Sequence, residues 1–286
     1  MHIRTLIEEK LLICPQCSEE NLSLEADAAK CNACHQKYSL ANDKIHFVVH
    51  EESPTHDSLD KIKTFFKKYP KLYGLLKDTV SPLYLKNDIG NFLRQNGGDK
   101  KVTVNLGSGN FAVAKNVFNL DLIAYDNVDI VSNLEKLPFK NDSVDLLIIN
   151  SVLEHVPNPG VVVLEMERIL RPGGKIFASV PFICGFHASP YDYTRWTREG
   201  VKVLFKDFQM EDLRPEGGPT SALLWVFQEW FATLFSFGSR TLFNLNYLLI
   251  MLLTWPFKYF DIFMRRLPTA HHIHSCFIFI GEKKAT

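Results

Sequence analysis

The sequence has no excess of charge of either sign. Its 286 residues include 32 lysines and arginines and 32 aspartates and glutamates. Proteins that bind nucleic acid broadly carry a basic surface, because neutralising phosphates supplies much of their affinity. The balance therefore disfavours nucleic acid as a partner. A local group of lysines between Lys61 and Lys77 is explained more simply as the solvated face of connecting helices.

Targeting signals and repeats are also missing. Residues 1–10 are charged and lack the apolar stretch of a signal peptide. No internal repeat or low-complexity tract is visible. The chain is long enough for a small module and one large core, so we expect a cytoplasmic protein of two domains.

Cysteine is scarce, and four of the six cysteines stand in two pairs. Cys14 and Cys17 form one C-x-x-C motif, and Cys31 and Cys34 form a second. Two such turns bring four thiolates into a tetrahedral site that suits zinc, and a closed site of this kind is structural. The alternative is disulfides in an exported protein, which the absent signal pattern disfavours.

An α/β pattern occupies residues 104–182. Residues 104–111 read V-N-L-G-S-G-N-F, a short apolar strand that runs into a glycine-rich turn. Further apolar runs at 117–121, 128–131, 144–150 and 175–180 surround a segment of helical spacing at 161–170. Strands that alternate with helices predict a doubly wound, mostly parallel sheet, which binds ligands at the carboxyl ends of its strands.

The motifs in this block closely resemble those of class I S-adenosylmethionine-dependent methyltransferases of the type 11-like group. The matching segments are N-L-G-S-G (105–109), N-L-D (119–121), L-P-F (137–139), D-S-V-D (142–145), L-E-H-V (153–156) and R-I-L-R-P-G-G (168–174). The resemblance covers about 101–214 and a last strand near 273–281. It implies a Rossmann-like methyltransferase fold, a methyl-transfer activity and S-adenosylmethionine as cofactor.

The resemblance also implies a cofactor site of eight residues: Asn105, Gly107, Ser108, Gly109, Asp121, Asn133, Leu134 and Asn150. Gly107 and Gly109 would pass under the methionine part of the cofactor, and Asp121 would hold the ribose. Residues 133–134 would border the adenine, and Asn150 would line the pocket.

Three departures from the family pattern stand out. Asn105 replaces the usual acidic residue, and Phe111 occupies the position of the third glycine. Only eleven residues separate Gly109 from Asp121. This is too short for an ordinary crossover helix, so we expect that helix to be short or missing.

Residues 12–49 resemble the small zinc-ribbon domain that activates methyltransferases, including Y-S-L at 38–40 and the strand at 45–49. We therefore predict three parts. These are a zinc-ribbon domain at 1–52, a helical connector at 53–100 and a methyltransferase domain at 101–286.

The stretch that follows the strand at 175–180 should lie over the edge of the sheet where an acceptor docks. His187 and Asp192 are candidates to remove a proton from a hydroxyl acceptor, because an alcohol needs a base to become a good nucleophile. Arg195 would bind an anionic acceptor or pair with Asp192. The alternative is that these residues lock the loop through mutual hydrogen bonds. His155 would line the pocket or fix the start of the following helix.

A hydrophobic, aromatic-rich helical insert at 222–264 interrupts the pattern before the last strand and contains Trp225, Trp230 and Trp255. Its longest uncharged run, 241–257, has seventeen residues, the lower limit for a membrane span. Both flanks must belong to one cytosolic domain, so a single span is excluded. The insert is interfacial, a shallow re-entrant hairpin, or a helix pair packed on the domain or on a second copy in a homodimer. We favour contact with a membrane surface.

These observations predict a zinc-containing S-adenosylmethionine-dependent methyltransferase, cytoplasmic and peripherally associated with the inner face of a membrane. The insert favours a lipid-linked or amphipathic acceptor of the saccharide type. One alternative is a methyltransferase that acts on rRNA or tRNA, since ribosomal RNA guanine methyltransferases also join a four-cysteine zinc site to this fold. The other is a cofactor-binding scaffold without catalytic activity.

Overall fold

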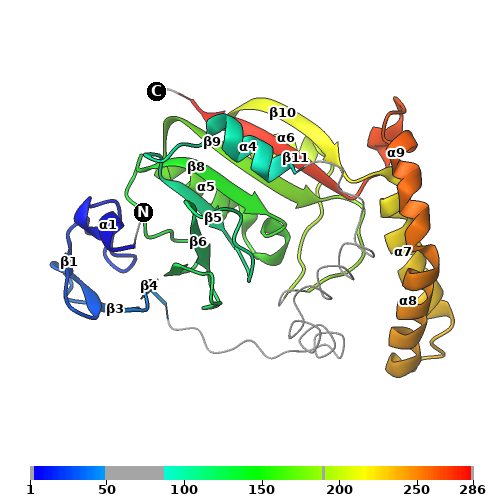
Figure 1. Cartoon of the computed structure of the whole chain (residues 1–286), viewed down its shortest axis with the longest axis horizontal. Coiled ribbons are helices and arrows are strands. Elements are labelled where there is room, and N and C mark those ends of the chain that lie inside the picture. The colour runs from blue at the N-terminus through cyan, green and yellow to red at the C-terminus, as the bar shows by residue number, and fades with distance from the viewer. Residues whose placement is uncertain (1–2, 49–86, 189–190, 285–286) are drawn as a thin grey trace.

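The computed structural model describes residues 3–48, 87–188 and 191–284. Its central feature is a mixed sheet of eleven strands in the order β1-β2-β3-β4-β7-β6-β5-β8-β9-β11-β10 (Figure 1). The strands are β1 Leu22–Leu24, β2 Ala28–Cys31, β3 Lys37–Ala41, β4 Lys44–His46, β5 Thr103–Leu106, β6 Phe118–Asp121, β7 Ile130–Val131, β8 Val144–Asn150, β9 Leu170–Pro181, β10 Phe208–Glu216 and β11 Cys276–Lys283. Most of the predicted connector, including its lysine group, lies outside the described residues.

The middle of the sheet has a doubly wound arrangement. Strands β7, β6, β5, β8 and β9 are parallel, and β11 runs antiparallel between β9 and β10. The direction of winding reverses between β5 and β8, which is the switch point where open α/β sheets bind ligands. The predicted Rossmann-like methyltransferase fold is confirmed.

Helices cover both faces of this sheet. Along β8, Leu146 and Ile148 face α4 (Asp88–Asn96) and pack with Phe92, whereas Leu147 and Ile149 join the cluster that contains α5 (Pro159–Ile169). A strand buried on both faces needs apolar residues at successive positions, which explains the continuous apolar run. The other helices of the domain are η1 Leu153–His155 and α6 Arg198–Leu204.

The first crossover has no helix. Among the described residues, the link between β5 and β6 forms only turns and bends. The prediction that this helix is short or missing is confirmed, and the link leaves the glycine turn next to the end of β6.

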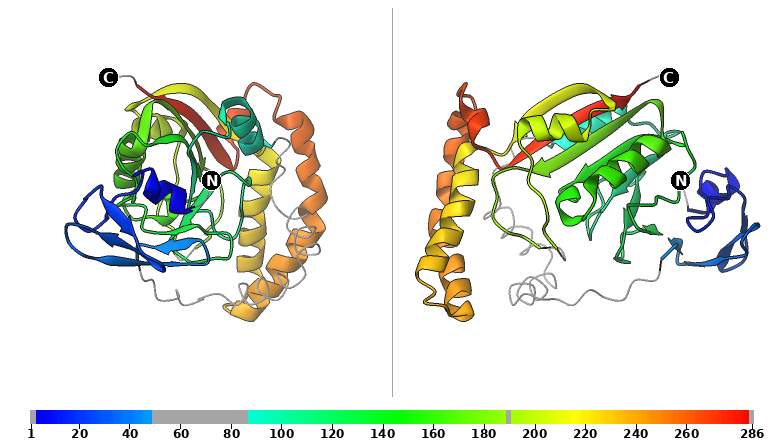
Figure 2. Two further views of the ribbon diagram at one scale, coloured as in Figure 1. Left: turned by 60° about the vertical axis from the view of Figure 1, so that its left-hand side comes forward. Right: turned by 180° about the vertical axis from the view of Figure 1, so that it is seen from behind.

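The N-terminal module, α1 (Ile3–Glu8) with β1 to β4, continues the same sheet (Figure 2). Strand β4 pairs in parallel with β7, and the amides of Ile45 and Phe47 donate to the carbonyls of Asp129 and Val131, both at 2.9 Å. The buried residues of the module and the larger domain form one continuous cluster. Edge pairing and a shared core therefore hold the module in place.

The C-terminal insert forms a helical hairpin between β10 and β11, at the end of the molecule far from the N-terminal module (Figure 1). It consists of α7 Pro219–Leu234, α8 Arg240–Thr254, η2 Trp255–Phe260, α9 Asp261–Met264 and η3 Ala270–His272. The buried carboxylate of Asp261 accepts hydrogen bonds from the amides of Thr220 and Ser221 at 2.7 and 2.8 Å. These bonds satisfy free donors at the start of α7 and join the beginning of the hairpin to its end.

Candidate cofactor and acceptor site

The turn after β5 requires glycine for two different reasons. Gly107 and Gly109 both have positive φ angles, +65° and +55°. A Cβ on Gly107 would lie 2.5 Å from the side chain of Val152, so the position has no room for one. A Cβ on Gly109 would meet nothing within 4 Å, so only the backbone conformation favours glycine there. The turn thus leaves open space on the side of Gly109.

Asp121, at the end of β6, supports this turn directly. Its Oδ2 accepts a hydrogen bond from the Gly109 amide at 2.8 Å, and its Oδ1 accepts one from the Ile123 amide at 2.9 Å. A carboxylate oxygen has two lone pairs, so each oxygen can still accept a further bond. Asn127 also holds the turn, by donating to the Gly109 carbonyl at 3.1 Å. The sequence analysis did not single out Asn127, which lies in an irregular link.

The other predicted cofactor residues gather at the carboxyl ends of neighbouring strands. Ser108 is buried in the turn, Leu134 is buried after β7, and Asn133 and Asn150 are exposed. Asn105 differs from these residues, because it is buried within β5 and donates to Asn119 Oδ1 at 3.1 Å. The structure therefore places Asn105 inside the sheet below the turn.

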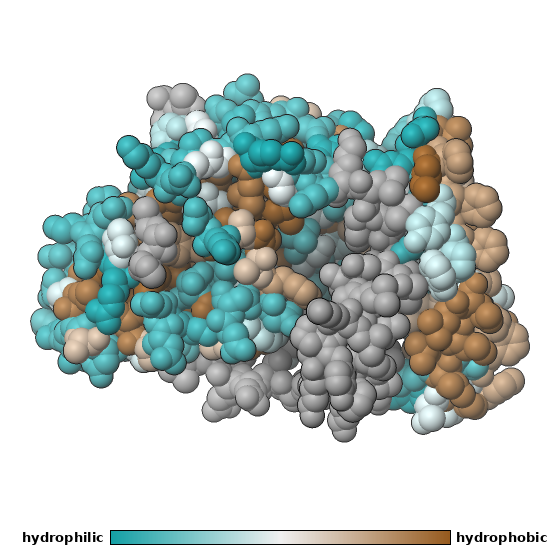
Figure 3. Space-filling model, in the orientation of Figure 1, coloured by the Kyte–Doolittle hydropathy of each residue, from teal (hydrophilic) through white to brown (hydrophobic). Residues whose placement is uncertain are grey.

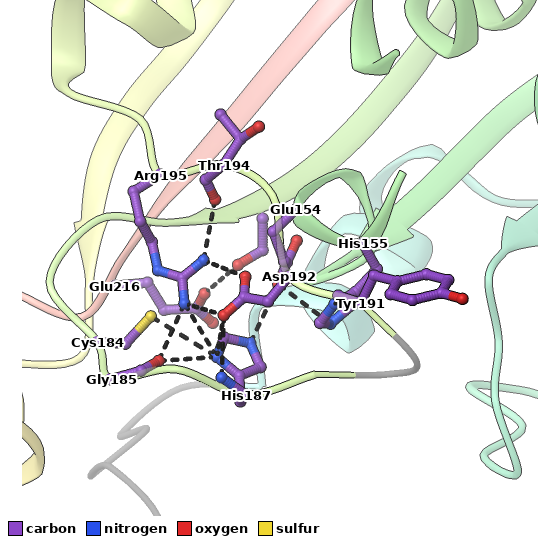
Figure 4. A network of polar contacts seen from close by, with 11 residues as sticks. Glu154, His155, Cys184, Gly185, His187, Tyr191, Asp192, Thr194, Arg195 and Glu216 are labelled. Carbon is purple, nitrogen blue, oxygen red and sulfur yellow. Dashed lines mark hydrogen bonds and ion pairs between the residues drawn. The ribbon is translucent and has the colours of Figure 1, made fainter. Parts of the chain in front are cut away.

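The predicted acceptor loop, the stretch after β9 that contains His187, Asp192 and Arg195, is locked by a pair of charged residues (Figure 4). Arg195 Nη2 donates to Asp192 Oδ2 at 2.6 Å, and Nη1 donates to the other carboxylate oxygen. The His187 amide also donates to Asp192, at 2.9 Å. Burial alone would raise the pKa of Asp192, but the Arg195 guanidinium and the His187 amide outweigh it and hold the pKa at about 2. Asp192 is therefore a weak base that shapes the loop.

Beneath the loop lies the fully buried carboxylate of Glu154. His187 Nε2 is 3.5 Å and His155 Nε2 is 3.9 Å from its Oε1. Burial lowers the pKa of His187, but its interactions with Cys184 and Glu154 outweigh that and raise the pKa to about 10. The sequence analysis gave Glu154 no role. The only signal was its place in the L-E-H-V motif.

The loop rests on the first helix of the hairpin. The ring of His187 lies 5.5 Å from that of Trp225, centroid to centroid, and Trp225 Nε1 donates to Glu229 at 3.2 Å. Any side chain at Gly185 would collide with the Glu229 carboxylate. A side chain at Gly185 would therefore have to displace the Glu229 carboxylate.

The hairpin exposes a large apolar surface. Figure 3 shows hydrophobic residues gathered over α7 and α8. Trp230 is 57% exposed, Phe237 84% and Leu253 62%. Among the described residues, one helical stretch, Arg240–Met264, has the length and composition to cross a membrane. A single stretch of this kind is weak evidence of a membrane span. Because β10 and β11 pair with each other, both flanks of the hairpin belong to one sheet.

The four cysteines of the N-terminal module meet in one place. Their sulfurs all lie within 4.8 Å of one another, with Cys14 to Cys34 at 3.6 Å and Cys17 to Cys31 at 3.5 Å. A disulfide bond has a length of about 2.05 Å, so these cysteines are free thiols. Tyr38 supports the cluster, with its hydroxyl 2.9 Å from Cys14 Sγ.

Comparison with known proteins agrees with this geometry. Residues 91–178 match the family model described as a methyltransferase domain. The matched region contains the glycine turn, Asp121 and the L-E-H-V motif. Together with the strand order, the match identifies this part of the chain as a methyltransferase domain.

Curated relatives match parts of the chain. An uncharacterized protein of Methanocaldococcus jannaschii is 31% identical over 124 residues, which are 40% of this chain and 60% of that protein. A ubiquinone biosynthesis O-methyltransferase of Dechloromonas aromatica is 35% identical over 57 residues, 20% of this chain and 23% of that protein. The chain thus matches less than two thirds of the length of these relatives.

One solved structure is similar at low sequence identity. A putative sarcosine dimethylglycine methyltransferase from Galdieria sulphuraria is 14% identical, with a TM-score of 0.47 and coverage of 81% of this chain and 100% of that chain.

Proposed function

We propose that this protein is an S-adenosylmethionine-dependent methyltransferase that works at a membrane surface on a lipid-linked or amphipathic acceptor. The observation that carries the proposal is the contact between the acceptor loop and the exposed apolar hairpin through His187 and Trp225. The glycine turn and Asp121 on one side of the sheet edge, and this loop on the other, would bring a cofactor and an acceptor together.

The residues of the turn fit the cofactor. Gly109 opens onto free space, whereas Gly107 is packed against Val152 and shapes the turn below it. The half-buried Asp121 keeps acceptor capacity for a pair of ribose hydroxyls. When bound, S-adenosylmethionine supplies an electrophilic methyl group on a sulfonium. The chain's own contribution is to hold the acceptor atom in line with that carbon, and such positioning supplies much of the rate.

The acceptor loop would act first as a rigid wall of the site. The bidentate contact between Asp192 and Arg195 fixes its shape, and the raised pKa of His187 keeps that imidazole protonated near neutral pH in the absence of other ligands. Removal of a proton by His187 or Asp192 remains a prediction, which the substitutions Asp192→Asn and His187→Gln test through the pH profile of kcat.

The four-cysteine cluster fits a structural zinc ion. Sulfurs about 2.3 Å from a tetrahedral zinc lie about 3.8 Å apart, close to the separations in the cluster. Four thiolates fill the coordination sphere, so zinc would stabilise the module and its pairing with β7. This role agrees with the expectation of an activator-like ribbon.

Membrane contact is supported by the composition of the hairpin surface. Its two acidic residues are withdrawn from the exposed face, because Asp261 is buried and Glu229 faces the loop. Arg265 and Arg266 are exposed and suit anionic headgroups. Lys258, in contrast, is 3% exposed and lies away from any headgroup. Because β10 and β11 pair with each other, both ends of the hairpin lie at one sheet, which favours an interfacial position over a single span.

Mass spectrometry of lipid and RNA fractions from cells with and without the protein tests this proposal. We expect a lipid-fraction species that lacks the mass of one methylene when the protein is removed. The same loss in RNA alone would replace the membrane proposal with RNA methylation. Absence of S-adenosylhomocysteine binding to the purified protein would favour the scaffold alternative.

A further inference from the structure

Glu154 has a buried carboxylate that faces two imidazoles without a hydrogen bond to either of them. Its side chain is fully buried, and within the described residues neither carboxylate oxygen has a hydrogen-bond partner. Burying an unpaired carboxylate costs several kcal/mol, so a native fold keeps one only where something compensates it. The methyltransferase site described above does not use this group.

Two imidazoles present one nitrogen each to this carboxylate. His155 Nδ1 lies 2.6 Å from the Tyr191 carbonyl, and His187 Nδ1 lies 3.1 Å from the Gly185 carbonyl (Figure 4). A carbonyl only accepts, so each Nδ1 can donate its proton there, and each Nε2 then has a lone pair for a metal once it carries no proton. Histidines that bind metals are oriented in the same way, by a carbonyl or carboxylate on the other ring nitrogen.

We propose that Glu154, His155 and His187 bind one divalent transition-metal ion, in a second metal site separate from the four cysteines. The three ligand atoms lie within 4.8 Å of one another. Ligands about 2.1 Å from a tetrahedral ion are about 3.4 Å apart, and the 3.5 Å between Glu154 and His187 already approaches this value. Two imidazoles and one carboxylate suit zinc, iron(II) or cobalt(II).

Other positive groups near Glu154 already have partners. Arg195 is held by Asp192 and by the Gly185 carbonyl, at 2.6 and 2.9 Å, although its Nη2 also lies 3.3 Å from His187 Nδ1. In the metal-free protein, the charge of Glu154 is balanced by a proton on His187. The ion takes the place of that proton, as metal binding to histidine generally requires.

The site is open on one side. The side chains of His155 and His187 are 13% and 31% exposed, whereas Glu154 is sealed from solvent. Three protein ligands leave at least one coordination position for water or another oxygen donor. This role rests on the proposed function: a hydroxyl of the acceptor would occupy that position, lose its proton to solvent more easily, and become the nucleophile.

The test uses purified full-length protein with its four-cysteine site loaded with zinc, and no cofactor or acceptor. Cobalt(II) is added, and equilibrium dialysis counts the ions bound while the visible spectrum reports their ligands. We expect one additional cobalt per chain, with a spectrum that lacks thiolate charge-transfer bands. Glu154→Gln, which keeps the shape and removes the charge, should weaken binding by about 100-fold or more.

Two further variants keep the result interpretable. His155→Ala changes a partly exposed ligand, so it should fold normally and also lose the additional cobalt. His271→Ala with His272→Ala is the matched control, because this exposed pair has ring centroids 4.3 Å apart and is the obvious adventitious site. It should retain the cobalt.

Binding lost in the control but retained in Glu154→Gln would overturn the proposal, as would a wild-type protein that takes up no cobalt beyond the cysteine site. Neither result depends on methyl transfer. A protein that binds cobalt at Glu154 but not S-adenosylhomocysteine would retain the metal site and reject the proposed function.

Discussion

The imidazole of His187 lies against the indole of Trp225, with 5.5 Å between ring centroids. This contact joins the loop over the sheet edge to the first helix of the apolar hairpin. A change in the position of the hairpin would therefore reach the acceptor loop directly. For the same reason, Trp225 is a poor probe of membrane contact, and exposed positions away from the loop serve better.

Replacing Trp230, Phe237 and Leu253 together by serine should weaken binding to anionic vesicles by about ten-fold or more, because apolar burial in the headgroup region is lost. Vesicle flotation measures this, and affinity for S-adenosylhomocysteine should not change. Leu164→Ser with Val203→Ser removes exposed apolar residues outside the hairpin, at 59% and 70% exposure, and is the control. A wild-type protein that never floats would remove the reason for a lipid-linked acceptor.

The two glycines of the turn should differ in their response to alanine. Gly107→Ala forces a Cβ against Val152 and adds backbone strain, which we expect to cost about 2–4 kcal/mol of stability. The methyl group added by Gly109→Ala enters free space, so this variant should lose only about 1 kcal/mol of stability, because alanine disfavours a positive φ. Thermal melts of the two variants measure which one loses more stability. Equal losses of stability would show that the Val152 side chain moves aside without an energetic cost.

Asp121→Ala should weaken S-adenosylhomocysteine binding by about 1.5–3 kcal/mol, the range for hydrogen bonds to a charged group. The variant also frees the amides of Gly109 and Ile123, so the turn itself should loosen. Calorimetry on wild type and variant provides the measurement, and Asn127→Ala separates the effect of turn support from that of the carboxylate. Similar losses in the two variants would argue against a direct contact with the ribose.

Cys31→Ser should release zinc and unfold the N-terminal module, because metal binding and folding are coupled in such small modules. Since Ile45 and Ile130 belong to one buried cluster and β4 pairs with β7, the larger domain should also melt at a lower temperature. Elemental analysis and a melt check both effects. Cys276→Ala changes a buried thiol outside the cluster and should retain the zinc.

His274 should make the fold sensitive to acid. Burial between Phe182 and Phe277 lowers the pKa of His274 to about 4. Between about pH 6.5 and pH 4 the unfolded chain binds this proton and the folded chain does not, so stability falls as the pH falls through that window, by about 3 kcal/mol at most. Urea unfolding of wild type and His274→Phe at several pH values gives the free energy of unfolding of each protein as a function of pH. The same pH dependence in both proteins would contradict the prediction.

The sheet could be predicted well from the sequence, because each pattern that indicates it involves residues close together in the chain. The apolar run in β8 reports burial on both faces, and the short interval between Gly109 and Asp121 leaves no room for a helix. The glycine turn was predictable for the same reason, since positive φ angles restrict the residue type wherever they occur.

Contacts between distant segments were decided only by the tertiary structure. The sequence by itself determined the strands and helices of the sheet region, the two C-x-x-C motifs and the apolar character of the hairpin, because periodicity and spacing are local properties. It did not determine that β4 would extend the sheet at β7, or that Trp225 would support His187. Nor did it show Glu154 buried between two histidines without a hydrogen bond. Burial and proximity arise from the packing of all elements together, and in this protein that packing turns an ordinary motif residue into a candidate metal ligand.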